Sequence, residues 1–139
     1  MGDASKPARI LIVDDFEIVR IMLRNALANL GHTDVDEAED GKVALQKIQA
    51  AEMDAKPYAL VFCDWNMPQM TGIEVLEAVR RNPHYAKLPI VMVTAEAEQK
   101  QVVQALRSGA TDYIVKPIAP EILEKKVNKI LSKINGSAA

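Results

Sequence analysis

The chain has 139 residues, 49% of them hydrophobic and 26% charged, with a formal net charge of −2. These values are typical of one globular domain and argue against the basic surface that nucleic-acid binding requires. No apolar run reaches the roughly 20 residues of a membrane span, and the first residues lack the apolar segment of a signal peptide. The single cysteine, Cys63, fits a reducing compartment. We therefore expect a cytoplasmic protein with no nucleic-acid binding and no membrane insertion.

Apolar runs and helical patterns alternate along the chain. The run at 9–13 predicts a first strand, and apolar residues spaced three and four apart from Val19 to Leu30 predict a helix that ends before Gly31. The same patterns predict strands at 33–38, 58–63, 88–95 and 111–117, and helices at 41–53, 72–81, 96–108 and 119–134.

Most of these strands are continuous apolar runs, which indicates a parallel sheet buried on both faces. The sequence therefore predicts an α/β fold of five βα units, a doubly wound five-stranded parallel sheet with helices on each side. We expect the domain to span 9–135 between flexible tails at 1–8 and 136–139, with 51–57 as a connecting loop.

Polar residues follow four of the strands. They are Asp14 and Asp15 after the first strand, Asp64 and Asn66 after the third, Thr94 after the fourth and Lys116 after the fifth. A single Asp after a strand is more often a helix cap or a turn residue. In an open parallel sheet, however, the carboxyl ends of the strands meet at the edge where ligands bind. We therefore expect these residues to form one site.

The chemistry of this set is coherent. The carboxylates of Asp14, Asp15 and Asp64 would repel one another, and a hard divalent cation relieves that repulsion. Mg²⁺ suits a few carboxylates and waters, and the backbone carbonyl of Asn66 could complete the ligand set.

The remaining residues fit phosphoryl transfer to an aspartate. Lys116 is a point charge suited to a phosphoryl oxygen, and Thr94 supplies a hydroxyl donor. A carboxylate nucleophile beside a metal and a cation has the parts for this reaction, in which catalysis is mostly positioning and charge neutralisation.

Four segments resemble the response-regulator receiver family: "ILIVDD" (10–15), "DWNMPQMTGIEVL" (64–76), "PIVMVTAEA" (89–97) and "GATDYIVKP" (109–117). Over nearly its whole length the chain is similar to the stand-alone chemotaxis regulators of that family. The resemblance implies a flavodoxin-like fold with strand order 2-1-3-4-5.

The resemblance also implies the role of each site residue. Asp64 would be the phospho-acceptor, with Thr94 and Lys116 contacting the phosphoryl group. Asp14, Asp15, Asp64 and the Asn66 carbonyl would bind Mg²⁺. A cis Lys116–Pro117 bond is implied as well.

A switch is implied too, in which Tyr113 turns inward when Thr94 moves toward the phosphoryl group. This movement would change the face made by 96–108, 111–115 and 119–134. Asn66 and Glu96 would set the lifetime of the phosphoryl group. Trp65 has two compatible interpretations, since its ring could shield the site or cap the hydrophobic edge of the core.

The implied partners are a histidine kinase as phospho-donor and a target protein such as the flagellar motor switch, with a phosphatase as a further candidate. We expect a monomer without an output domain after residue 135, so that output would act by binding. A phosphorelay shuttle or an adapter for a non-flagellar regulator is the alternative. The protein would not be an enzyme beyond catalysing its own phosphorylation and dephosphorylation.

Two other classes fail on particular residues. A phosphatase with an aspartyl-phosphate intermediate needs a second acid two residues after the nucleophile, where this chain has Asn66, and a cap domain for which the chain has no room. A flavodoxin-like flavin binder needs phosphate-binding donors in the first loop. This loop is "DDFE" (14–17), which repels phosphate unless a metal intervenes.

Overall fold

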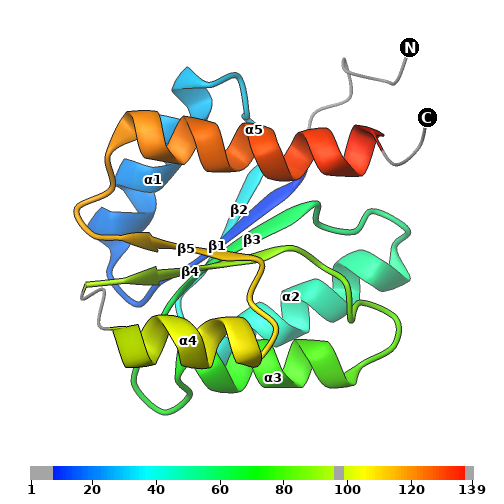
Figure 1. Ribbon diagram of the computed structural model, residues 1–139. Coiled ribbons are helices and arrows are strands. Elements are labelled where there is room, and N and C mark those ends of the chain that lie inside the picture. Colours follow the sequence, from blue (N-terminus) through cyan, green and yellow to red (C-terminus); the bar gives the residue numbers. More distant parts are fainter. Residues whose placement is uncertain (1–7, 96–98, 137–139) are drawn as a thin grey trace.

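The computed structural model describes residues 8–95 and 99–136. Five strands and five helices alternate along them (Figure 1). The elements are β1 (Ile10–Val13), α1 (Glu17–Asn29), β2 (Val35–Ala38), α2 (Gly41–Met53), β3 (Leu60–Asp64), α3 (Gly72–Arg81), β4 (Ile90–Thr94), α4 (Gln99–Arg107), β5 (Asp112–Val115) and α5 (Pro120–Gly136). The strands form one sheet in the order β2-β1-β3-β4-β5, and every neighbouring pair is parallel. The predicted fold class and strand order are confirmed.

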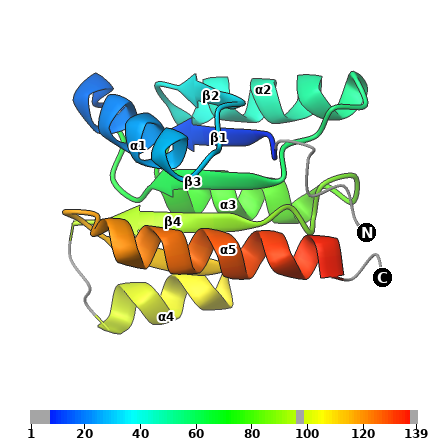
Figure 2. The ribbon, with the colours of Figure 1, turned by 90° about the horizontal axis from the view of Figure 1, so that it is seen from above.

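The sheet is the middle of three layers (Figures 1 and 2). Helices α1 and α5 cover one face, and α2, α3 and α4 cover the other. Because successive side chains on a strand point to opposite faces, β3 contributes to two separate cores. Leu60 and Phe62 pack with Leu27 of α1 and Leu123 of α5. The alternate residues of the same strand join the core beneath α2, α3 and α4.

The observed element ends agree closely with the expected ones, with a few informative differences. The expected helices at 41–53 and 72–81 are α2 and α3. Strand β3 continues through Asp64, so that carboxylate belongs to the strand. Part of the helix expected at 96–108 is described as α4, while residues 96–98 lie outside the described residues. The domain and tail boundaries stay predictions.

The apolar stripe of α1 is less buried than its spacing suggests. Leu23 and Leu27 are buried, whereas Met22 is 62% exposed. The outer part of the stripe lines a groove of about 390 Å³ with Lys116, Pro117 and Ile118. Helical spacing identifies an apolar face, but how much of it is covered depends on neighbouring elements.

Arg80 connects two loops at the amino ends of the strands. Arg80, at the end of α3, donates hydrogen bonds to the carbonyl oxygens of Gly109 (2.8 Å), Ala86 (3.0 Å) and Leu88 (2.7 Å). These carbonyls belong to the loops before β4 and β5.

Among the described residues, no helix is both long and apolar enough to cross a membrane.

Candidate functional site

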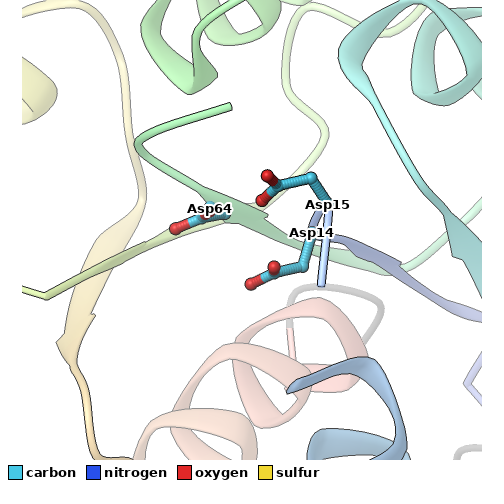
Figure 3. Close-up of side chains that lie close together, drawn as sticks. All are labelled: Asp14, Asp15 and Asp64. Atoms are coloured by element: carbon cyan, nitrogen blue, oxygen red, sulfur yellow. The ribbon is translucent and has the colours of Figure 1, made fainter. Parts of the chain in front are cut away.

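Three carboxylates meet at the carboxyl edge of the sheet (Figure 3). Asp14 and Asp15 follow β1, and Asp64 ends β3, which is the neighbour of β1. One carboxylate oxygen from each residue lies within 4.8 Å of the others. Asp14 is 2% exposed and Asp64 is 4% exposed. The chain therefore concentrates negative charge where little water is available to screen it.

Lys116 supplies a cation to this cluster. Its Nζ atom lies 3.1 Å from Oδ1 of Asp64 and 3.2 Å from Oδ2 of Asp14. Burial lowers the pKa of Lys116, but the two carboxylates outweigh that effect and the pKa is raised overall. Lys116 is therefore charged at neutral pH. The Lys116–Pro117 peptide bond is cis, as the resemblance implies.

Asp64 itself is hard to ionise. Burial and then the nearby charge of Asp14 raise its pKa from 3.8 to about 6, although Lys116 acts in the opposite direction. A single ammonium group thus offsets only part of the repulsion. An added cation near the three carboxylates would favour the ionised form of Asp64.

The donor set fits a magnesium ion. Within the described part of the chain, Oδ1 of Asp15 is buried and has no hydrogen-bond partner. An unsatisfied buried carboxylate oxygen costs about 1–3 kcal/mol or more, so it calls for a ligand. Magnesium prefers oxygen ligands and is commonly held by one or two carboxylates together with waters. Asp14, Asp15 and Asp64 provide such oxygens.

The loop after Asp64 is held close beneath it. Gly72, the first residue of α3, donates its N–H to the carbonyl of Trp65 at 2.9 Å. A Cβ atom on Gly72 would lie 2.2 Å from the Asp64 carbonyl oxygen, so only glycine fits. Thr71 and Glu74 form a capping box that starts the helix here.

Two further residues of this loop were singled out from the sequence. Trp65 is 9% exposed and belongs to the core beneath α2, α3 and α4, so its ring does cap the hydrophobic edge. Asn66 is exposed and lies two residues after Asp64, just beyond the end of β3. The role of its carbonyl in metal binding stays a prediction.

The residues expected to form a switch lie on one face of the sheet. Thr94 ends β4 and is 3% exposed. Tyr113 of β5 lies opposite Met92 of β4 and packs partly against the core of that face. Since Thr94 follows Met92 by two residues, its side chain points to the same face. Glu96, expected to affect phosphoryl lifetime, lies outside the described residues.

Sequence reasoning missed two cations that contact this region. Lys126 of α5 lies 4.6 Å from the ring centroid of Tyr113 and donates to Oδ1 of Asp112 at 2.8 Å. Arg20 of α1 donates to the backbone carbonyl of Asp14 at 2.7 Å. Neither position stands out from spacing alone, although a cation one turn into the helix after an acidic pair is a usable signal.

Comparison with known proteins identifies the class. A family model described as the response regulator receiver domain matches residues 10–128. The chain therefore belongs to the response-regulator receiver family. Membership makes it a signalling protein of two-component systems rather than a conventional enzyme, and receiver domains generally use Mg²⁺.

Two curated relatives of this chain are chemotaxis proteins. The chain is 42% identical over 128 residues to the chemotaxis protein CheY of Pseudomonas aeruginosa, which covers 92% of this chain and 99% of that protein. It is 38% identical over 130 residues to the chemotaxis protein CheY-3 of Vibrio cholerae, covering 94% and 96% respectively.

Solved structures agree with this result. The chemotaxis response regulator CheY4 of Vibrio cholerae superposes with a TM-score of 0.80 at 36% identity, covering 90% of this chain and 99% of that one. A two-component response regulator from Clostridium difficile gives a TM-score of 0.79 at 29% identity, covering 92% and 98%. The fold and its family are thus consistent across sequence and structure.

Proposed function

We propose that this protein accepts a phosphoryl group on Asp64 from a histidine kinase, with Mg²⁺ bound by the acidic cluster, and then binds a target through the face of α4, β5 and α5. The observation that carries the proposal is that three carboxylates lie within 4.8 Å of one another at one sheet edge, with the Lys116 ammonium paired to two of them, Asp14 and Asp64. That arrangement suits transfer to a carboxylate better than it suits binding of a preformed anion.

The proposed reaction is an exchange of one bond to phosphorus for another. A carboxylate oxygen of Asp64 forms the new O–P bond as the N–P bond to the histidine of the donor breaks, and that histidine retains the electron pair. Lys116 stabilises the added negative charge on the phosphoryl oxygens, and the Thr94 hydroxyl donates to one of them. Bound Mg²⁺ would neutralise charge on the carboxylates and the phosphoryl group. Asp14, Asp15, Asp64 and the Asn66 carbonyl would hold it.

The switch is proposed to couple Thr94 to Tyr113. Both side chains belong to the same face of the sheet, one on each of two neighbouring strands. Movement of Thr94 toward a phosphoryl group would free space on that face for Tyr113. Exposed Val103 and Leu106 of α4 and Ile122 of α5 are apolar surface on the face whose partner affinity would change.

The proposed setting is chemotaxis in the cytoplasm. The curated relatives named above are chemotaxis proteins, which favours the flagellar motor switch as target over the alternative of a phosphorelay shuttle or adapter. We expect a monomer that a phosphatase can act on. Asn66 and Glu96 would set how fast the phosphoryl group is lost to water.

The test is intact-protein mass after incubation with acetyl phosphate and MgCl₂. We expect one phosphoryl adduct on the wild-type protein, none without magnesium, and none on Asp64→Asn. Asp54→Asn is the matched control, because Asp54 is an exposed acid at the end of α2 and should leave the adduct intact. An adduct that persists in Asp64→Asn would refute the assignment of the acceptor.

A further inference from the structure

Each polar atom of Asp14, in the backbone and in the side chain, has a hydrogen-bond partner. Its N–H donates to the carbonyl of Ala38 at 3.1 Å, and its Oδ1 accepts from the N–H of Phe16 at 2.9 Å. Its Oδ2 lies 3.2 Å from Lys116 Nζ, and its carbonyl oxygen accepts from Nη1 of Arg20 at 2.7 Å. Arg20 is the only one of these partners that acts on the peptide group leading to Asp15.

That peptide group determines where Asp15 points. The carbonyl of Asp14 and the nitrogen of Asp15 lie in one rigid plane, because the peptide bond does not rotate freely. Fixing the carbonyl oxygen therefore fixes the plane and the Cα position of Asp15. Asp15 is the residue whose buried Oδ1 has no hydrogen-bond partner within the described chain.

Arg20 is itself anchored away from the site. Its Nε donates to Oε1 of Glu37 at 2.9 Å, while Nε of Arg24 donates to Oε2 of the same carboxylate at 2.9 Å. The two arginines are four residues apart and share one face of α1. The side chain of Arg20 is 14% exposed and that of Arg24 is 41% exposed. Of these two arginines, it is Arg20 that also contacts the acidic pair, through the Asp14 carbonyl.

We propose that Arg20 is a positioning residue for the metal site: by bridging Glu37 on β2 and the Asp14 carbonyl, it orients the peptide that directs the Asp15 carboxylate toward a bound cation. This inference rests on the magnesium site proposed above. Residues that orient metal ligands typically contribute tenfold or more to metal affinity. We expect Arg20→Met to weaken Mg²⁺ binding by about tenfold or more.

A charge effect and a positioning effect predict opposite changes in the Mg²⁺ affinity of Arg20→Met. Removing a positive charge beside three carboxylates should strengthen the binding of a cation if Coulomb interactions alone matter. Weaker binding by Arg20→Met can therefore not be explained by the lost charge. Arg20→Lys keeps the charge but lacks the planar group that reaches Glu37 and Asp14 together. It should also bind Mg²⁺ more weakly than the wild-type protein.

Arg24→Met is the matched control. Arg24 shares the Glu37 carboxylate and donates to the carbonyl of Val35, and both of these acceptors belong to β2 rather than to the acidic pair. General loosening of α1 against β2 should affect both arginine variants alike. A positioning role affects Mg²⁺ affinity in the Arg20 variants alone, so we expect Arg24→Met to stay within twofold of the wild-type protein.

The experiment is calorimetric titration of each folded protein with MgCl₂, together with urea unfolding to confirm that each variant is native before titration. If Arg20→Met does not fold, Arg20→Lys carries the comparison. Equal or tighter Mg²⁺ binding by the Arg20 variants would overturn the proposal, and so would equal weakening in Arg24→Met. Absence of any magnesium binding by the wild-type protein would instead overturn the metal site itself.

Discussion

The acidic cluster should reduce the stability of the protein when no metal is bound, and Asp64→Asn should recover it. The folded protein keeps the proton on Asp64 up to about pH 6, whereas an unfolded chain loses it near pH 3.8. Folding therefore takes up protons between these values, and the free energy of unfolding falls as the pH rises through them. Well above pH 6, Asp64 is ionised in both states, and the free energy of unfolding is lowered by the full amount.

The size of the effect follows from that difference in pKa. A rise from 3.8 to about 6 corresponds to about 3 kcal/mol at neutral pH, as an upper value. Asparagine has nearly the same shape and no charge, so Asp64→Asn should raise the free energy of unfolding by about 1–3 kcal/mol at pH 7.5. The gain should shrink toward pH 4, where the wild-type side chain is protonated in the folded state.

Urea unfolding followed by the fluorescence of Trp65, the one tryptophan of the chain, measures this difference. The two proteins are compared at pH 7.5 and pH 4.5 with a chelator present. Added MgCl₂ should then reduce the difference in free energy of unfolding between the two proteins at pH 7.5, because a cation that binds only the folded wild-type protein stabilises it. Asp54→Asn, a change at an exposed acid, should have the wild-type stability. A variant no more stable than the wild-type protein at pH 7.5, or a gain that does not depend on pH, would refute the reasoning.

Two further changes test parts of the scaffold. Gly72→Ala places a Cβ atom 2.2 Å from the Asp64 carbonyl oxygen, so we expect a loss of about 1–3 kcal/mol in urea unfolding and less phosphoryl adduct by mass. A variant with wild-type stability and adduct would show that the loop can shift at no cost. Arg80→Met leaves three carbonyls without their donor and should cost about 1–3 kcal/mol. Arg81→Met, at an exposed neighbour on α3, should change stability by less than about 0.5 kcal/mol, and equal losses in both variants would contradict this account.

Much of the fold was predictable because its patterns are local. Continuous apolar runs and three- or four-residue spacing depend only on neighbours in the chain, so β1 through α5 could be assigned from the sequence. The stripe on α1 shows the limit of this reasoning. Met22 is equivalent to Leu23 as an apolar residue on the periodic face, yet it is 62% exposed. Its burial depends on the distant loop that carries Pro117 and Ile118, which periodicity does not describe.

The candidate site was predictable for a different reason. Residues that follow parallel strands must meet at one edge, so Asp14, Asp64 and Lys116 could be brought together before any coordinates were known. The contacts of Arg20 and Lys126 could not, because a long side chain can reach several partners from one position on a helix. Their partners include a backbone carbonyl and an aromatic ring, and the sequence does not specify which cation reaches either of them.

The ion pairs at the two sides of the sheet have a consequence for association between copies of the chain. Strands β2 and β5 are the open edges, and an open edge can pair with a strand of another molecule. Each edge strand has four residues and carries acidic side chains that form ion pairs. On β2, Asp36 pairs with Arg9, and Glu37 pairs with Arg20 and Arg24. On β5, Asp112 pairs with Lys126. Short, charged edges disfavour such pairing. The same contacts that orient side chains inside the molecule therefore protect the folded protein from edge-to-edge aggregation.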